Sequence, residues 1–170
     1  GKKSEYFINT NTIVSQNKQF ISHFLHGLKL KSYRFDKYKT KKENRIITIN
    51  VFGNKNTPSI KSQLKFKALE EGTFYARDLV SEPGNILHPD EYAKRLNSLK
   101  KDGIRINIYD KKKLKKLGMN ALLGVGMGSI KGSYLVTMEW NGAKNNSKPI
   151  AFVGKGVTFD TGGYSLKPAR

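Results

Sequence analysis

Apolar and polar residues follow one another along most of the chain with the periods of helices and strands. Apolar positions three or four residues apart predict amphipathic helices over residues 16–31 and 59–81. Between them, residues 37–45 are basic and polar and predict a loop, and the β-branched run 45–52 predicts a strand. Residues 53–59 are rich in turn formers and are the best candidate for a domain boundary. The apolar stripe of the longer helix consists of Leu64, Ala68, Leu69, Gly72, Tyr75, Ala76, Leu79 and Val80.

Helices and strands alternate in the second half of the chain, which predicts a layered α/β domain. The expected elements, in chain order, are a helix that begins at His88-Pro89 and ends near residue 103, a strand over 104–108, a short helix capped by Asp110, a strand over 134–140 and a buried strand over 149–153.

The composition supports a folded protein with a real core. The chain has 170 residues, of which 37% are hydrophobic and 11% aromatic, and this is the size of one domain or slightly more. Its net charge is +19, but 26 of the 32 basic residues are Lys, and they are spread through the whole chain. Because recognition of phosphates and bases relies more on Arg, this excess indicates a solvated surface with nonspecific attraction to polyanions. Nucleic acid is therefore a partner that the charge allows but does not favour.

Two groups of residues leave alternatives open. Tyr33, Phe35 and Tyr38 lie between basic residues and could stack on bases, although packing at a domain edge fits them better. His23 and His26 could share a metal ion, but no third ligand is evident nearby, so a place on a helix flank is the simpler interpretation.

Absent sequence features exclude several classes of protein. The chain has no cysteine, which excludes disulfides, thiolate zinc sites and a cysteine nucleophile and suits a reducing compartment. No apolar run approaches the roughly 18–20 residues that cross a bilayer, and the N-terminus lacks the apolar core of a signal peptide. We therefore expect a cytoplasmic protein with no membrane partner.

The chemistry concentrates in residues 149–167, where an apolar run leads into two glycine-rich turns. Ligand sites of open α/β sheets lie just beyond the carboxyl ends of their strands. There the sequence places Lys155 between two glycines, Asp160 before Gly162-Gly163, and Lys167 further on. One carboxylate and two amines on such a turn could hold an anion or a metal ion, or they could be solvated residues of an ordinary turn. Spacing alone leaves both interpretations open.

Two nucleotide-binding motifs fail on spacing. A phosphate loop needs a Ser or Thr directly after its Lys, and a glycine at the position that Pro149 occupies, so residues 154–156 do not form one. The glycines at 124, 126 and 128 do not complete a G-x-G-x-x-G pattern and predict a tight packed turn.

The segment GKGVTFDTGGYSLKP at 154–168 resembles the motif of the leucyl aminopeptidase family, two-metal cytosolic exopeptidases. Three further segments resemble this family in the family's order. Residues 32–42 resemble the end of its N-terminal domain, residues 72–91 the opening of its catalytic domain, and residues 114–142 the approach to its active-site strand. Together these segments cover most of residues 20–170, and the chain is identified as a member of this family.

The resemblance implies a site and a fold. It makes Lys155 a metal ligand through its neutral amine, Asp160 a carboxylate ligand, and Lys167 a catalytic lysine near the scissile carbonyl. It implies two divalent metal ions (Mn or Zn), peptide substrates with a leucine-type N-terminal residue, and a homo-oligomer, in this family a hexamer. It also implies the end of a small N-terminal α/β domain over residues 1–58, followed by the first part of a layered α/β/α catalytic domain with a mixed sheet over 59–170.

The sequence departs from the family chiefly in length. The family's remaining carboxylate ligands and its active-site arginine follow the motif, whereas this sequence ends at Arg170, so we expect an internal fragment whose isolated chain is inactive. Thr161 replaces a frequent serine, Gly84 a frequent alanine, and His88 a threonine that would cap a helix better. Two other classes stay open, a non-catalytic basic module that binds nucleic acid and a remnant that completes an oligomer. Nucleic-acid binding that falls steeply with salt and needs no metal would indicate the module.

Overall fold

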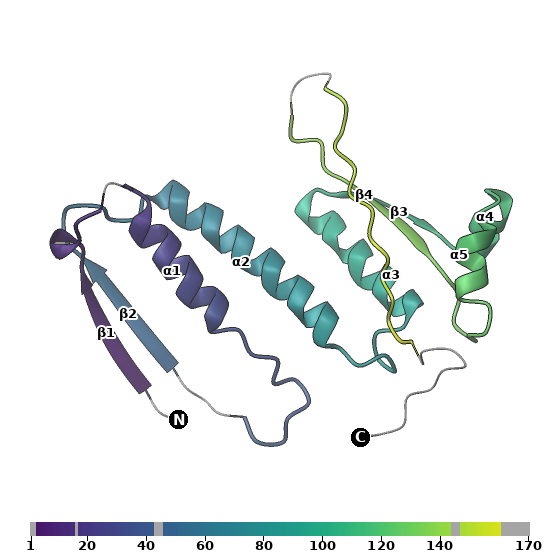
Figure 1. Cartoon of the computed structure of the whole chain (residues 1–170), viewed down its shortest axis with the longest axis horizontal. Helices are drawn as coiled ribbons and strands as arrows, with labels where there is room; N and C mark the ends of the chain where they lie inside the picture. The colour runs from purple at the N-terminus through teal and green to yellow at the C-terminus, as the bar shows by residue number, and fades with distance from the viewer. Residues whose placement is uncertain (1–2, 16, 43–45, 144–146, 161–170) are drawn as a thin grey trace. The chain divides into compact units, whose positions relative to one another are not determined.

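The computed structural model describes residues 3–15, 17–42, 46–143 and 147–160. The chain forms two compact units, Gly1–Ser81 and Glu82–Arg170, each with its own buried residues (Figure 1). The elements of the first unit are β1 (Lys3–Asn9), a 3-10 turn (Thr10–Thr12), α1 (Phe20–Lys31), β2 (Ile46–Phe52) and α2 (Ile60–Ser81). Those of the second unit are α3 (Pro89–Asn97), a 3-10 turn (Ser98–Asp102), β3 (Arg105–Tyr109), α4 (Lys111–Lys116), α5 (Asn120–Val125) and β4 (Leu135–Glu139).

The sheet of the first unit consists of two parallel strands. β1 and β2 pair in register from Lys3 opposite Ile46 to Asn9 opposite Phe52. The predicted strand over 45–52 is confirmed as β2. The pattern does not reveal β1, because its first three residues are polar and show no alternation.

A turn after β2 is held by residues that follow β1. The side-chain oxygen Oδ1 of Asn11 accepts hydrogen bonds from the N–H groups of Asn54 (2.8 Å) and Lys55 (3.1 Å). Gly53 has a φ of 122°, and a Cβ at this position would overlap the fully buried Thr10. Both the backbone conformation and the lack of space therefore require glycine there.

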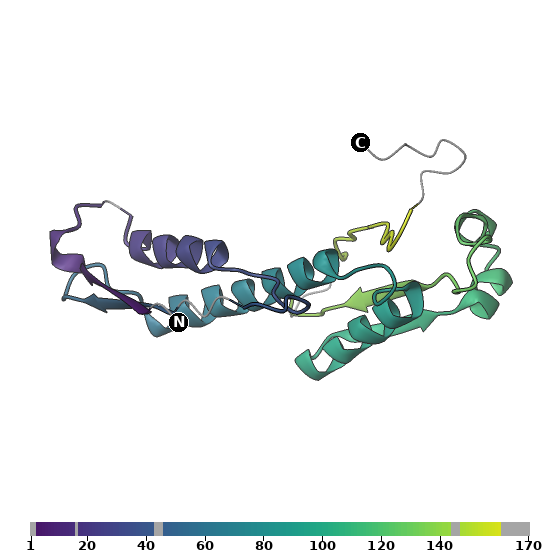
Figure 2. The same cartoon turned by 90° about the horizontal axis from the view of Figure 1, so that it is seen from below.

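Helices α1 and α2 lie side by side and pack against each other (Figure 2). The side of α2 that carries Phe66 faces α1. The Phe66 ring centre lies 4.9 Å from that of His23 and 4.7 Å from that of His26. The predicted bounds of α2 are confirmed within a residue, while α1 begins four residues later than predicted. The predicted apolar stripe of α2 is largely exposed, at Leu64 and Val80 for example, because α1 covers the Phe66 side instead.

The aromatic residues after α1 pack within the first unit. The ring of Tyr33 lies 5.3 Å from that of Phe74, and its hydroxyl donates a hydrogen bond to Asp78 Oδ1 at 2.8 Å. Desolvation and this hydrogen bond raise the pKa of Tyr33 above its ordinary value. Arg77 lies over the same ring and donates a hydrogen bond to the carbonyl oxygen of Leu30 (2.6 Å). Tyr33 thus joins the loop after α1 to the C-terminal half of α2.

In the second unit, β3 and β4 form an antiparallel pair in which Arg105 lies opposite Glu139 and Tyr109 opposite Leu135. Helix α3 packs on β3, and the core of the unit is small. Its buried apolar residues are Leu87, Ala93, Ile106 and Leu114. The predicted strands 104–108 and 134–140 are confirmed as β3 and β4.

Helix α4 is confirmed with the predicted cap. The Asp110 side chain accepts a hydrogen bond from the N–H of Lys113 at 2.9 Å, which satisfies one of the free amides of the first turn. The helix α5 was not predicted, because Gly124 and Gly126 dominate its pattern and favour a turn.

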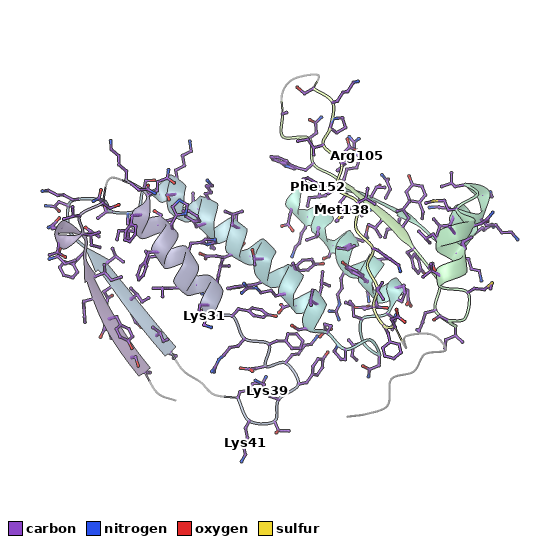
Figure 3. The ribbon with its side chains drawn as sticks, viewed as in Figure 1. Lys31, Lys39, Lys41, Arg105, Met138 and Phe152 are labelled. Atoms are coloured by element: carbon purple, nitrogen blue, oxygen red, sulfur yellow. The ribbon has the colours of Figure 1, made fainter. Side chains whose placement is uncertain are left out.

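The predicted buried strand over 149–153 is wrong for the structure. These residues belong to no sheet, and Ile150, Phe152 and Val153 are exposed. Phe152 is labelled in Figure 3. A strand needs ladder hydrogen bonds and covered faces, and the only partner of β4 among the described residues is β3.

The molecule therefore has a mixed α/β fold with a small parallel sheet and a small antiparallel sheet. Helix α2 groups with the first unit because it packs against α1, whereas the sequence assigns it to the second domain. The limits 1–58 and 59–170 stay a prediction. No helix among the described residues is long and apolar enough to span a membrane.

Candidate functional site

Lys155 and Asp160, two of the three candidate residues, lie in the extended segment that follows residue 147, drawn in yellow in Figure 1. Both side chains are exposed. Lys167 lies outside the described residues. The structure therefore places two candidate ligands on one short segment that has no helix or strand of its own.

Tyr92 of α3 lies against this segment directly after Lys155. A Cβ built on Gly156 would lie 2.8 Å from Cε1 of the Tyr92 ring, 3.5 Å from Cδ1 and 3.8 Å from Cζ. Real Cβ atoms do not approach a ring carbon so closely, so the ring occupies the space that a side chain at 156 would need. Sequence reasoning placed Tyr92 on the buried side of a helix but did not connect it with the candidate site.

A second glycine contact lies directly before Asp160. A Cβ on Gly84 would lie 3.0 Å from the carbonyl oxygen of Thr158 and 3.1 Å from Cβ of Phe159. The turn between α2 and α3 therefore approaches the segment by its backbone. Both contacts therefore lie between the two candidate ligands, Lys155 and Asp160.

Charged side chains join α3 to the turn that precedes it. The Nη2 atom of Arg95 lies 2.6 Å from Oε2 of Glu82, and its Nε lies 3.0 Å from Oε1 of Glu91. The Glu82 side chain is only 1% exposed, so this ion pair is largely withdrawn from water. The hydrogen bond with Arg95 holds the pKa of Glu91 below its ordinary value, and the same bond is the largest cause that raises the pKa of Arg95.

The first turn of α3 confirms the weak cap predicted from His88. The His88 side chain makes no capping hydrogen bond and pairs through Nδ1 with Asp90 instead. Desolvation alone would raise the pKa of Asp90, but hydrogen bonds from its own backbone amide and from His88 hold it below the ordinary value. Lys131 Nζ lies 3.8 Å from the same carboxylate.

The donor set of the segment fits part of a metal centre. The carboxylate of Asp160 is a ligand for divalent ions, and the amine of Lys155 becomes one when it loses its proton. In the part of the chain that the structure describes, no three His, Cys, Asp or Glu side chains gather as a metal site. One carboxylate and one amine cannot satisfy two dications, so a complete centre needs further ligands.

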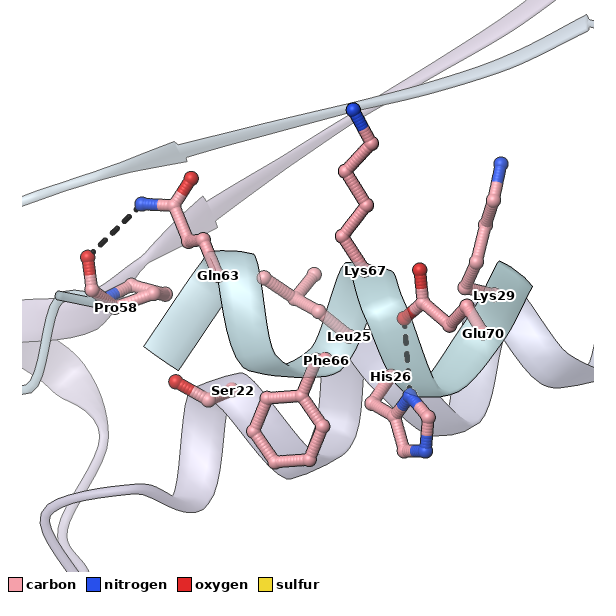
Figure 4. A pocket seen from close by; sticks show the side chains of 9 residues that line it. All are labelled: Ser22, Leu25, His26, Lys29, Pro58, Gln63, Phe66, Lys67 and Glu70. Atoms are coloured by element: carbon pink, nitrogen blue, oxygen red, sulfur yellow. Dashed lines mark hydrogen bonds and ion pairs between the residues drawn. The ribbon is translucent and has the colours of Figure 1, made fainter. Parts of the chain in front are cut away.

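The histidine pair of α1 makes other contacts. His26 Nδ1 lies 2.9 Å from Glu70 Oε1 on α2, beside a pocket of about 260 Å³ (Figure 4). The residues around this pocket are Ser22, Leu25, His26, Lys29, Pro58, Gln63, Phe66, Lys67 and Glu70. Neither Lys155 nor Asp160 lines it.

Sequence comparison connects this chain with known proteins. The sequence model described as "Cytosol aminopeptidase family, catalytic domain" matches residues 74–170. A probable cytosol aminopeptidase of Bradyrhizobium sp. (strain BTAi1) is 46% identical over 147 residues, which are 84% of this chain and 30% of that protein. One of Brucella ovis is 49% identical over 152 residues, with the same shares. The chain thus spans about 30% of the length of these curated relatives.

Structural comparison supports the fold. A structure of the bottromycin maturation enzyme BotP in complex with Mn matches with a TM-score of 0.67 and 23% identity, over 81% of this chain and 29% of that one. A second BotP structure matches with a TM-score of 0.65 over 81% and 30%. At this level of identity, the likeness concerns the arrangement of the backbone.

Proposed function

Because this chain belongs to the cytosol aminopeptidase family, we propose that it supplies part of the active site of a metallo-aminopeptidase, an enzyme that releases N-terminal residues from peptides. The observation that carries the proposal is the match to the catalytic domain over residues 74–170, which include Lys155 and Asp160. The contacts of Tyr92 and Gly84 with the backbone between these two residues support it.

Each candidate residue has a role that its chemistry permits. Asp160 would hold divalent metal with its carboxylate, and Lys155 would hold it with a neutral amine. Two such ions, when bound, polarise the scissile carbonyl and activate a water molecule at neutral pH. Lys167, which is outside the described residues, would place a cation beside the negative charge that develops on the carbonyl oxygen. The resemblance of the motif, rather than a measured geometry, supports the assignment of Lys167.

The finer features implied by the resemblance belong to the same proposal. They are Mn or Zn as the metal, peptides with a leucine-type N-terminal residue as substrates, a hexamer as the assembly, and a layered α/β/α catalytic domain with a mixed sheet beginning at residue 59. The Mn in the BotP complex supports Mn. The name of the relatives, cytosol aminopeptidase, supports a cytoplasmic location.

We expect the isolated 170-residue chain to be inactive and to bind divalent ions weakly. Asp160 is one carboxylate where two ions need several. The test titrates the purified chain with Mn²⁺ and Zn²⁺ by calorimetry and assays a leucyl amide in parallel. Micromolar binding of two ions, or turnover that follows the metal concentration, would show that this chain carries a complete site.

The same experiment, extended to the protein at its full natural length, tests the function itself. There we expect two bound ions and metal-dependent release of leucine from the amide. Tight binding to DNA or RNA that weakens steeply with salt, without any metal-dependent hydrolysis, would favour the basic binding module instead.

A further inference from the structure

The contact between Tyr92 and Gly156 concerns the residue next to a proposed metal ligand. Gly156 follows Lys155 directly, and the Tyr92 ring fills the space on its Cα. A peptide with a ring pressed against one side has fewer accessible backbone conformations than a free one, particularly at glycine. The ring therefore restricts the backbone from which the Lys155 side chain begins.

The Tyr92 ring is itself well supported. Tyr92 lies in the first turn of α3, where its N–H donates a hydrogen bond to the carbonyl oxygen of His88 at 2.9 Å. The next residue, Ala93, is buried, and Arg95 on the following turn binds the buried Glu82 at 2.6 Å. A ring on a helix fixed in this way is a firmer support than a ring on a loop.

We propose that Tyr92 is a positioning residue for the metal centre, which sets the direction in which Lys155 presents its amine. The proposal rests on the proposed role of Lys155 as a ligand. Residues that orient a metal ligand without touching the metal change metal affinity when they are replaced. Tyr92 would act in this way through the backbone of Gly156, by steric contact.

The atoms in contact indicate that the ring of Tyr92, and not its hydroxyl, positions the backbone of Gly156. The nearest atoms to the Cβ position of Gly156 are the ring carbons Cε1 and Cδ1, at 2.8 and 3.5 Å. Replacement by phenylalanine keeps both carbons, so Tyr92→Phe should position Lys155 as the wild type does. Tyr92→Ala removes both carbons and should weaken metal binding. A structural hydrogen bond of the hydroxyl would give the opposite result for Tyr92→Phe.

A matched control lies in the same unit. The ring of Tyr134 also lies beside a glycine, with its Cε2 3.6 Å from the Cβ position of Gly132, which is an ordinary contact distance. Tyr134→Ala removes an equal ring, which is not among the atoms near Gly154 or Gly156.

The experiment titrates the metal-free protein, at its full natural length, with Mn²⁺ by calorimetry and measures kcat and KM for a leucyl amide. We expect Tyr92→Ala to weaken Mn²⁺ binding about 10-fold and to lower kcat more than it raises KM, because the loss concerns the centre and not substrate contacts. Tyr92→Phe and Tyr134→Ala should bind Mn²⁺ as the wild type does.

A double variant sharpens the test. Gly156→Ala places a methyl group where the ring lies and should also weaken Mn²⁺ binding. In Gly156→Ala/Tyr92→Ala the methyl group enters the space that the ring has left, so this variant should bind no more weakly than Gly156→Ala. If Tyr92→Ala does not fold, Gly156→Ala, which removes no packing atoms, still tests the contact.

The outcomes separate this inference from the proposed function. A wild-type protein that binds no Mn²⁺ contradicts the proposed function and, with it, this inference. If the wild type binds two ions, the positioning role alone is overturned by Tyr92→Ala or Gly156→Ala with wild-type affinity, by an equal loss in Tyr92→Phe or Tyr134→Ala, or by strictly additive losses in the double variant.

Discussion

Helix α4 and the segment 154–160 lie in the same unit and both present lysines, yet they are built in opposite ways. Helix α4 has five lysines in six residues, its own cap at Asp110 and a buried anchor at Leu114. No ion pair among the described residues includes an α4 lysine. The segment 154–160 has one lysine and no local structure, and its described supports are Tyr92 and Gly84.

The difference shows that a high local positive charge and a lysine able to bind metal are separate properties. The five ammonium groups of α4 are on exposed side chains and interact weakly with one another, and that of Lys113 also donates a hydrogen bond to the carbonyl oxygen of Ile108 at 3.2 Å. A single lysine on the same short segment as a carboxylate, where residues distant in the sequence contact the backbone, can serve as a ligand if it loses its proton. The comparison predicts that changes on the segment have large effects and that matched changes on α4 have small ones.

The largest effect should come from Asp160→Asn in the full-length protein. A neutral amide cannot balance the charge of two dications, so we expect leucyl amide hydrolysis to fall by more than about 100-fold, beyond the loss typical of outer-shell changes. Asp110→Asn is the matched control, because asparagine is also a good helix cap and this carboxylate serves only α4. Near-normal turnover of Asp160→Asn with bound metal would refute its assignment as a ligand.

The second largest effect should come from Lys155→Arg, which keeps a basic residue at this position. Arginine keeps its proton under all ordinary conditions and offers no lone pair to a metal ion, so Lys155→Arg should lose one of the two bound ions or bind it at least about 10-fold more weakly. Calorimetry with Mn²⁺ measures the stoichiometry directly. Lys112→Arg on α4 should bind both ions normally. Two tightly bound ions in Lys155→Arg would mean that this lysine is not a ligand.

Loss of the support of α3 should affect stability. Arg95→Ala removes the cation that lies 2.6 Å from the buried carboxylate of Glu82, which costs about 3–5 kcal/mol of unfolding free energy. Lys94→Ala, one residue before it, removes an exposed partner of Glu91 at 3.7 Å and should cost less than about 1 kcal/mol. Urea unfolding of both variants compares the two values, and equal midpoints would contradict the role of the Arg95–Glu82 pair.

The smallest effect should follow charge reversal of several α4 lysines, chosen from Lys111, Lys112, Lys113, Lys115 and Lys116. These side chains are exposed, and reversal relieves the repulsion between lysines one turn apart. We expect peptide hydrolysis to stay within about 2-fold of wild type, in line with the small energies of exposed charges. A loss as large as that of Asp160→Asn would reveal a function of this face.

The sequence allowed prediction of the elements whose causes are local. The cap of α4 at Asp110, the long helix α2 and the alternating strand β3 all follow from residues within a few positions of one another. The strand β1 and the exposed segment at 149–153 could not be predicted so, because a strand exists only when a partner pairs with it. The candidate ligands were found from a motif, whereas their supports, Tyr92 and Gly84, required the structure because they lie far from the segment in the sequence.

The contact between Gly84 and Thr158 has a consequence for the time at which the site forms. It closes a loop of about 70 residues, so it is among the slow, nonlocal steps of folding. A local element such as α4 forms from the unfolded chain within about a microsecond. At a synthesis rate of about 5–20 residues per second, residues 154–160 are added to the chain several seconds after Tyr92 of α3. The segment that carries the chemistry therefore reaches its contacts with Gly84 and Tyr92 only after the helices and strands of its unit have been synthesised.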